Sequence, residues 1–280
     1  MNASPQILRI ALLASALFVT SLPAATLVDW TFDSYTAGQT ITSVTSNTIT
    51  LNANATTGGN ATVTANTPNS GTAVSASFSG NNYLSSAAVV PELNFGTSQA
   101  FTIEGWFNLN SITNAQTIIS NRTTTNVTTS GWFAVETAAA GAGLTFSINP
   151  EGGTSTFSVT ASQTLSTGTW YYFAASRNTS DQLTVSLYST DALLATGFAS
   201  NARSGALTST SATFLGARAS DLSTRLSNGS LINEIRISDA YLTGNQLLWT
   251  SAIPEPSSAA VLAGVGALLC ASVVRRRRQN

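Results

Sequence analysis

Acidic side chains are the groups in this chain whose spacing could support catalysis. Glycoside hydrolysis by a retaining mechanism needs two carboxylates close together, as on alternate residues of one strand face. Glu104 stands alone, and Asp29 and Asp33 are four residues apart, too far for a tight pair on one strand. Glu234 lies two residues from Arg236 on one face, which indicates a surface ion pair. We therefore expect structural roles for these acids and assign no catalytic residue.

Two residue types that are missing or misplaced remove most other catalytic chemistry. The chain contains no histidine, and its one cysteine, Cys270, lies in an apolar C-terminal stretch. Ser-His-Asp and Cys-His nucleophilic catalysis and histidine-ligated zinc therefore have no residues to build them. The region before that stretch also lacks a cysteine for a disulfide or a thiolate metal site. The composition favours a protein that binds over one that reacts.

Loop oxygen ligands leave calcium as an alternative. Calcium takes six to eight oxygens from carboxylates, amides and backbone carbonyls. Asp33, Asn81, Asn82 and Asp239 could contribute if the first and last strands of the domain pair. Their spacing is not diagnostic, and the same residues favour Asx turns. We therefore assign no metal ligand and no cofactor, with calcium at the rim as the alternative.

Aromatic rings could form a platform for sugars. The candidates are Trp30, Trp106, Trp132, Trp170 and Trp249. In a β-sandwich most such rings pack in the core, where a large side chain contributes heavily to burial. Trp132 follows Ser130-Gly131 and is the tryptophan expected nearest a loop, although core packing is favoured for it too. The ligand-binding residues stay unknown at this level.

The elements that must position these residues are short strands separated by Gly, Asn, Ser and Thr. Residues 27–33, 101–107 and 183–188 alternate apolar and polar side chains, the pattern of a strand with one buried face. Residues 170–175 are instead a continuous apolar run, as expected for a strand buried on both faces. Helical periodicity is nearly absent between the two ends of the chain.

These patterns predict an all-β protein with one antiparallel domain. Residues 39–80 are dominated by Thr, Asn, Ser, Ala and Gly and predict weak edge strands with long loops. Residues 26–250, about 225 in number, are within the size range of a single two-sheet sandwich or barrel. This region carries six arginines, eleven acids and no lysine, a formal net charge of −5. It has no run of basic residues, so nucleic-acid binding is not expected.

Five segments have the composition, order and spacing of a known strand series. They are residues 101–107, 170–176, 183–188, 213–218 and 229–237, preceded by a strand and turn at residues 78–84. Over residues 27–250 the chain thus resembles the LamG-like, concanavalin A-like jelly roll, an antiparallel two-sheet sandwich. Asn233 stands where that family often has an aspartate, and Tyr172 where a histidine is common. Both departures weaken the case for a family-type metal or polar site.

The resemblance implies binding of glycans or proteins, sometimes through a calcium ion at the rim. Related sandwiches include glycoside hydrolases and lyases, so the fold alone does not choose the function. Because the acids are unpaired, we expect a non-catalytic domain that contacts extracellular polysaccharide or surface components. A structural matrix protein without a small ligand is the first alternative, and a carbohydrate-active enzyme is the second.

The N-terminal 25 residues predict export. Arg9 is followed by an apolar run at residues 10–19 and by small residues that allow cleavage near Ala24 or Ala25. This order is typical of a secretory signal peptide. The apolar run is about ten residues, half of the ~20 that a transmembrane helix needs.

The C-terminal segment, residues 251–280, predicts a membrane address. Its parts are Pro254, Glu255 and Pro256, an apolar stretch at residues 257–274, and Arg275, Arg276, Arg277 and Arg278. As a helix the apolar stretch spans roughly 27 Å, slightly less than a ~30 Å hydrocarbon core, and the arginines stay in the cytoplasm. The order resembles the sorting signal of bacterial PEP-CTERM proteins, which implies removal of the tail by an exosortase-type membrane enzyme. An ordinary transmembrane anchor is the alternative. Either way we expect transient or lasting membrane contact and delivery to the cell surface or extracellular matrix of a Gram-negative-type bacterium.

Overall fold

The computed structural model describes residues 24–55, 59–68, 73–79, 81–122, 130–153, 155–200, 204–219 and 224–249. Sixteen strands are found there: β1 (Thr26–Thr31), β2 (Ser43–Ser46), β3 (Ile49–Ala55), β4 (Thr62–Thr64), β5 (Ser75–Phe78), β6 (Asn82–Ser86), β7 (Phe101–Asn108), β8 (Gln116–Ser120), β9 (Trp132–Thr137), β10 (Leu144–Asn149), β11 (Phe157–Ala161), β12 (Trp170–Arg177), β13 (Leu183–Tyr188), β14 (Leu193–Ala199), β15 (Phe214–Leu215) and β16 (Ser230–Ser238). The same residues contain three 3-10 helices: η1 (Pro91–Leu93) between β6 and β7, η2 (Ala139–Gly141) between β9 and β10, and η3 (Gly244–Gln246) after β16.

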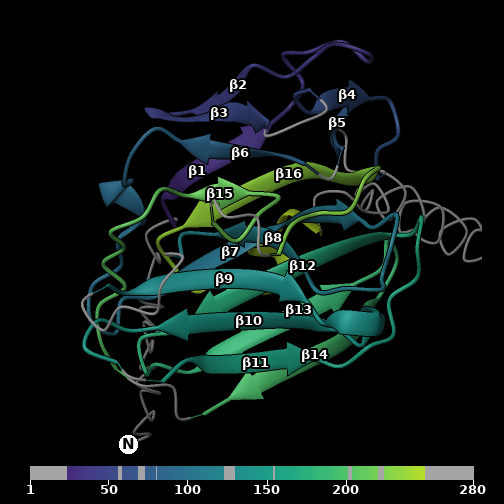
Figure 1. Cartoon of the computed structure of the whole chain (residues 1–280). Helices are drawn as coiled ribbons and strands as arrows, with labels where there is room; N and C mark the ends of the chain where they lie inside the picture. Colours follow the sequence, from purple (N-terminus) through teal and green to yellow (C-terminus); the bar gives the residue numbers. More distant parts are fainter. Residues whose placement is uncertain are drawn as a thin grey trace, which may run out of the picture.

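The strands form two eight-stranded antiparallel sheets that face each other. Sheet A has the order β14-β13-β12-β7-β16-β5-β4, with β1 also paired to β16, and sheet B has the order β11-β10-β9-β8-β15-β6-β3-β2. In Figure 1 sheet B is towards the viewer and sheet A lies behind it. The predicted all-β two-sheet sandwich is confirmed. The first and last strands of the domain do pair, β1 against β16.

The core lies between the sheets, and the strand patterns explain it. Val28, Trp30 and Phe32 alternate inward from the region of β1, and all three are fully buried. In β13 the buried and half-buried positions alternate strictly, as the sequence predicted. The central strands β7 and β12 are buried on both faces over nearly their whole length. For β12 this confirms the interpretation of its continuous apolar run.

The segment from residue 39 to residue 79 forms β2 to β5. Of these strands β2 ends sheet B and β4 ends sheet A, so the prediction of weak edge strands is confirmed for both. β5 pairs with the first part of β16, and β1 pairs with the remainder of the same strand. Asn233 lies where the two partners meet, and its buried amide donates to the carbonyl of Val74 and the hydroxyl of Ser75. An aspartate could not donate these two bonds, which explains the departure from the family residue.

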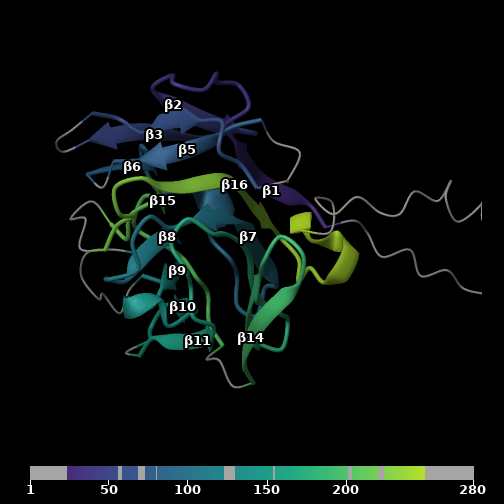
Figure 2. The ribbon, with the colours of Figure 1, turned by 90° about the vertical axis from the view of Figure 1, so that its right-hand side faces the viewer.

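Residues 239–249, which we call the strap, cross the outer face of sheet A. Leu242 and Leu247 of the strap pack against Trp106 and Tyr172, a cluster separate from the main core. Ala24 packs against the same cluster, so both ends of the described chain lie on this side of the sandwich. Figure 2 shows the strap, in yellow-green, on the outer side of β7 and β16.

The predicted signal helix and C-terminal helix lie outside the described residues, apart from Ala24 and Ala25 immediately before β1. Across the ranges given above, no helix is long and apolar enough to cross a membrane.

Candidate functional site

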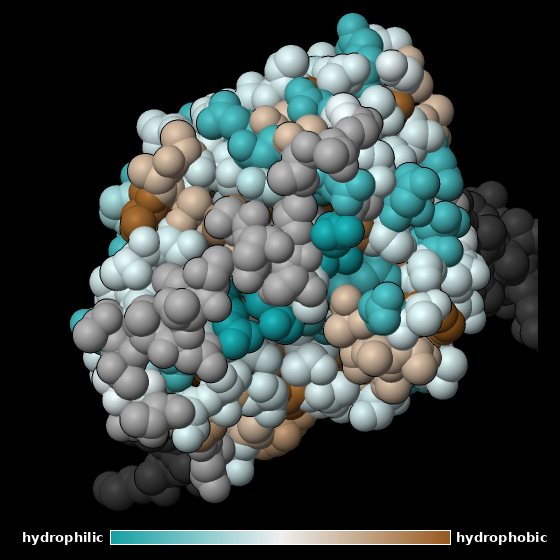
Figure 3. All heavy atoms as spheres, in the orientation of Figure 1, coloured by the Kyte–Doolittle hydropathy of each residue, from teal (hydrophilic) through white to brown (hydrophobic). Residues whose placement is uncertain are grey.

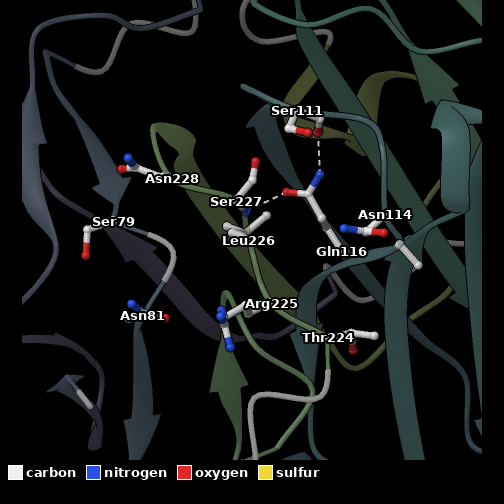
Figure 4. Close-up of a pocket in the computed structure, with 11 residues that line it drawn as sticks. Ser79, Asn81, Ser111, Asn114, Gln116, Thr224, Arg225, Leu226, Ser227 and Asn228 are labelled. Carbon is white, nitrogen blue, oxygen red and sulfur yellow. Dashed lines mark hydrogen bonds between the residues drawn. The ribbon is translucent and has the colours of Figure 1, made fainter. Parts of the chain in front are cut away.

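A polar pocket opens at one end of the sandwich, where three loops meet. Its volume is about 520 Å³. The loops are the β5–β6 turn, the β7–β8 connection and the β15–β16 connection. The pocket is lined by Ser79, Asn81, Ser111, Asn114, Ala115, Gln116, Thr224, Arg225, Leu226, Ser227 and Asn228. Figure 4 shows this lining, with Gln116 between the β7–β8 loop and the residues around Ser227.

Gln116 holds two of these loops together. Its amide nitrogen donates to the carbonyl oxygen of Ser111, and its amide oxygen accepts the backbone N–H of Ser227 at 2.7 Å. The side chain is 2% exposed, so both bonds form away from water. Asn110 adds a third link, because its amide donates to the carbonyl of Asn228 at 2.9 Å. The wall of the pocket is thus fixed before any ligand arrives, which lowers the entropy lost on binding.

The other wall is fixed through sheet B. The backbone N–H of Leu226 donates to the carbonyl of Gly216, and the carbonyl of Thr224 accepts the N–H of Arg218, both at 2.9 Å. The Thr224 hydroxyl also reaches the carboxylate of Glu136, which forms a two-point ion pair with Arg218 at 2.8 and 3.0 Å. These contacts tie the loop at residues 224–228 to the outer face of sheet B.

Among the loop residues that the structure describes, the pocket presents hydroxyls, amides and the guanidinium of Arg225, and none of these lining residues is a carboxylate. Such groups bind neutral polar ligands through hydrogen bonds, and the arginine brings up to five donors. A retaining or inverting glycosidase needs a pair of carboxyl groups that flank the bond to be cut. Hydroxyls, amides and a guanidinium are groups suited to non-covalent recognition of a polar ligand.

Sheet B also turns a polar face to solvent beside this pocket. On β10 and β11, Thr145 and Thr160 share a hydroxyl hydrogen bond at 2.9 Å, and Ser147 and Ser158 share one at 2.8 Å. Figure 3 shows hydrophilic side chains gathered near the middle of the face that is towards the viewer. The polar surface thus extends beyond the pocket.

Glu104 lies in a covered position on sheet A, outside the pocket. Its side chain is fully buried on the outer face of sheet A, beneath the strap. The carboxylate pairs with Arg236, accepts the hydroxyl of Tyr172, and accepts the backbone N–H of Leu248 at 3.0 Å. Burial raises the pKa of Glu104, while Arg236 and the hydrogen bonds oppose that effect. The predicted surface ion pair between Glu234 and Arg236 is wrong, because β7 lies next to β16 and brings Glu104 to the arginine instead.

Glu234 meets another acid in place of an arginine. It is 8% exposed, and it lies beside Asp29 of the neighbouring β1. Burial and the charge of Asp29 raise the pKa of Glu234 to about 8. Gly105 explains the tight packing here, because a Cβ at that position would collide with the carbonyl of Glu234, next to a register shift in β16. This pair of acids lies in the packed interior of a sheet face, not in a cleft.

The residues considered for calcium are not brought together. Asp33 accepts the backbone N–H of Ala73 just beyond one end of β1, and Asp239 accepts that of Ala25 at the other end. Eight residues of extended chain separate Asp33 from Ala25, roughly 26 Å. Within the described ranges, no three acidic, histidine or cysteine residues are grouped so that they could hold a metal ion.

The two asparagines of the β5–β6 turn have different roles. Asn82 is fully buried, and its amide bonds to the backbone N–H and hydroxyl of Ser79 and to the carbonyl of Gly59, so it stabilises the turn. Asn81 lines the pocket. Of the four residues considered for calcium, only Asn81 therefore faces the candidate site.

The tryptophans divide between the core and the outer faces. Trp30 lies in the main core, as expected for most of them. Trp106, Trp170 and Trp249 belong instead to the cluster under and beside the strap. Trp132, expected nearest a loop, begins β9 and is 1% exposed, with the guanidinium of Arg122 4.5 Å above its ring. None of the five lines the pocket.

The sorting and cleavage residues are largely outside the described part of the chain. Ala24 and Ala25 are described, and Ala25 pairs with Asp239 through hydrogen bonds in both directions. Pro254, Glu255, Pro256 and the four tail arginines lie beyond residue 249. The predicted cleavage site and sorting motif therefore stay predictions.

The pocket itself was not found from the sequence. Its residues are Ser, Asn, Thr and Gln, which are abundant throughout the chain and carry no diagnostic spacing. More than 100 residues separate Gln116 from its partner Ser227. Only the strand pairing of β7 with β16 brings their loops to the same end of the sandwich.

Comparison with known proteins agrees with this architecture. Residues 78–247, more than half of the chain, match the family model of the concanavalin A-like lectin/glucanases superfamily. Domain 4 of AbnA, a GH43 extracellular arabinanase from Geobacillus stearothermophilus solved with arabinotriose, superposes with a TM-score of 0.58 at 15% identity, over 83% of this chain and 100% of that one. The binding domain of botulinum neurotoxin DC in complex with SialylT gives a TM-score of 0.55 at 11% identity, over 82% of this chain and 52% of that one. No curated protein sequence gives a significant match. The chain belongs to the concanavalin A-like lectin/glucanases superfamily.

Proposed function

We propose that this chain is an exported, non-catalytic carbohydrate-binding protein that contacts extracellular polysaccharide through the pocket around Gln116. The observation that carries the proposal is the pocket itself. It has a volume of about 520 Å³, and its described lining residues present hydroxyls, amides and the guanidinium of Arg225. Sugar hydroxyls both donate and accept hydrogen bonds, so they match such a lining. One structural neighbour was solved with arabinotriose and another in complex with SialylT. These complexes support a saccharide as the ligand class.

The arrangement of acids supports binding over catalysis. Glu104 is covered by the strap and bonded to Arg236, Tyr172 and Leu248. Glu234 is paired with Asp29 and is nearly fully buried. A general acid or nucleophile must reach the glycosidic bond, and neither carboxylate opens to the pocket.

The two ends of the chain support delivery to the cell surface. Residues 1–25 have the order of a secretory signal peptide, and residues 251–280 have the order of a PEP-CTERM sorting segment. In this proposal an exosortase-type enzyme removes the tail after export, and the sandwich stays in the extracellular matrix. Replacement of Pro254, Glu255 and Pro256 by alanine tests this step. Loss of tail removal, seen as a full-length band in membranes, is expected. Unchanged tail removal and release would contradict the role of this motif in sorting.

Binding is tested on a glycan array with the full chain in detergent micelles. We expect recognition of one group of polysaccharides, and a loss of at least tenfold in affinity for the double variant Asn114→Ala, Asn228→Ala. Both side chains are exposed at the pocket mouth, so stability should not change. The matched control is Thr145→Ala, Thr160→Ala, which removes a hydroxyl pair from the outer face of sheet B. An array without any bound glycan would favour a structural matrix protein, and equal losses in both variants would place binding outside the pocket.

A further inference from the structure

Large exposed apolar side chains gather at one edge of the sandwich. Five are found among the described residues, and four lie on sheet A or on the strap that crosses it: Leu193 (53% exposed), Leu194 (37%), Phe198 (59%) and Tyr241 (37%). We call these four the apolar edge. The fifth, Val89, follows β6 of sheet B. A single exposed leucine needs no explanation, but a group on one face often marks an interaction site.

Strand pairing places the apolar edge on the outer face of sheet A. Leu193 pairs with Tyr188 and Phe198 with Thr184, and these partners alternate with the core residues of β13. A register shift between β13 and β14 at Leu193 brings both leucines outward. β14 is the last strand of sheet A, seven residues long, and has no charged side chain. The inner side of β14 packs against β11 of sheet B, since a Cβ at Gly197 would collide with the carbonyl of Thr160, so the exposed part of this strand is its outer face.

The chain leaves the described domain beside this edge. The ring of Trp249 lies 4.6 Å from that of Tyr188, the pairing partner of Leu193, and its indole N–H donates to the carbonyl of Ser189 at 2.9 Å. Tyr241 lies between Ala240 and Leu242, which pack in the same cluster. Figure 2 shows the strap and β14 on the same side of the sandwich.

The short segment after Trp249 limits the distance between the apolar edge and a membrane. Seven residues, 250–256, lie between Trp249 and Ser257, where the apolar stretch of 257–274 begins. Fully extended, the chain from Trp249 to Ser257 spans at most about 27 Å. Once that stretch is in a bilayer, the sandwich stays within this distance of the lipid surface. The tether raises the effective concentration of the apolar edge at the surface, so weak apolar contacts become sufficient for docking.

We infer that the apolar edge docks on the phospholipid surface while the tail is in the membrane. The inference rests on the membrane tail of the proposed function. The occupant is a neutral bilayer surface, because β14 offers apolar area and no cation to attract anionic headgroups. None of the residues that line the pocket belongs to β12, β13, β14 or the strap, so docking leaves the pocket open to glycans.

The experiment reports the environment of β14 in the full chain. Cys270, the only cysteine, is replaced by serine, and a fluorophore is attached either to Thr196→Cys in β14 or to Ser158→Cys in β11. Both positions are exposed, and each has one hydroxyl hydrogen bond to the neighbouring strand. The chain is reconstituted into phosphatidylcholine vesicles that contain brominated lipid. We expect quenching at position 196 to exceed that at position 158 by at least twofold.

Two variants distinguish docking of the apolar edge on the bilayer from mere closeness of the sandwich to it. Leu193→Ser, Leu194→Ser, Phe198→Ser should abolish the excess quenching at position 196, and Val89→Ser should leave it unchanged. A chain that floats with the vesicles but shows equal quenching at both positions overturns this inference alone. A chain that does not float with the vesicles overturns the membrane tail as well. Glycan binding by the pocket is independent of both results.

Discussion

The outer face of sheet A and the pocket at the loop end are both rich in polar groups, but they differ in where those groups find partners. Under the strap, the carboxylate of Glu104 bonds to Arg236, to the hydroxyl of Tyr172 and to the backbone N–H of Leu248. In the pocket, Gln116 is bonded within the wall, while Asn114 and Asn228 are exposed at the mouth. A buried group whose partners belong to the same chain supports the fold, whereas a polar group at an open cavity is available to a ligand.

The largest expected effect is the loss of Glu104. Glu104→Ala removes the partner of Arg236, Tyr172 and the strap, and leaves a partly buried guanidinium without its carboxylate. We expect a loss of about 3–5 kcal/mol in the free energy of unfolding, measured by urea denaturation. The control is Glu136→Ala, whose ion pair with Arg218 is nearer the surface, with side-chain exposures of 13% and 26%. That variant should lose about 1 kcal/mol. Similar losses of unfolding free energy in both variants would mean that the buried contacts under the strap stabilise the fold no more than the ion pair near the surface.

The next effect concerns pH. Because the pKa of Glu234 is raised to about 8 by burial beside Asp29, the folded state keeps a proton that the unfolded chain releases above about pH 4.5. The free energy of unfolding therefore falls as the pH rises from about 4.5 to 8, and the loss is complete above pH 8. Glu234→Gln is neutral at every pH and should be about 4 kcal/mol more stable than the wild type at pH 8, with little difference at pH 4. Parallel stability profiles from pH 4 to 9 would contradict the buried acid pair.

Gln116 shares a property with each region, because its side chain is buried and it also forms part of the pocket wall. Gln116→Ala leaves the N–H of Ser227 and the carbonyl of Ser111 without their partner, at a cost of about 1–2 kcal/mol in unfolding free energy. Glycan affinity should fall as well, since the loops lose their link. The double variant Asn114→Ala, Asn228→Ala should lose affinity alone. If Gln116→Ala loses stability and keeps full affinity, the wall at residues 111–116 does not contribute to the site.

The sequence predicted those features that depend on neighbours along the chain. Alternation identified β1 and β13, and a continuous apolar run identified β12, because a strand records the burial of its faces every second residue. The contact of Glu104 with Arg236 was missed, since it depends on β7 pairing with β16 across more than 100 residues. The neighbour in sequence, Glu234, was the wrong partner for the same reason.

The pocket was missed because its residues are common and its loops are distant in sequence. Ser, Asn and Thr occur in nearly every loop of this chain, so composition gave no contrast between Asn228 and any other loop asparagine. The strap was missed because residues 239–249 show no strand or helix pattern. Their Thr243 and Gln246 do form a capping box around η3, a local signal that the sequence contains.

The smallest expected effect is that of calcium removal. A ligand that binds only the folded state raises the thermal midpoint, and its removal by chelator lowers it. Asp33 and Asp239 bond to backbone N–H groups at opposite ends of β1, and the amide of Asn82 is engaged within its own turn. We therefore expect a change of less than about 1 °C between EDTA and millimolar calcium, measured by differential scanning calorimetry. A larger rise of the thermal midpoint with calcium that is lost in Asn81→Ala would mean that the pocket binds a cation. Asn81 would then be a ligand-binding residue and not only part of the pocket lining.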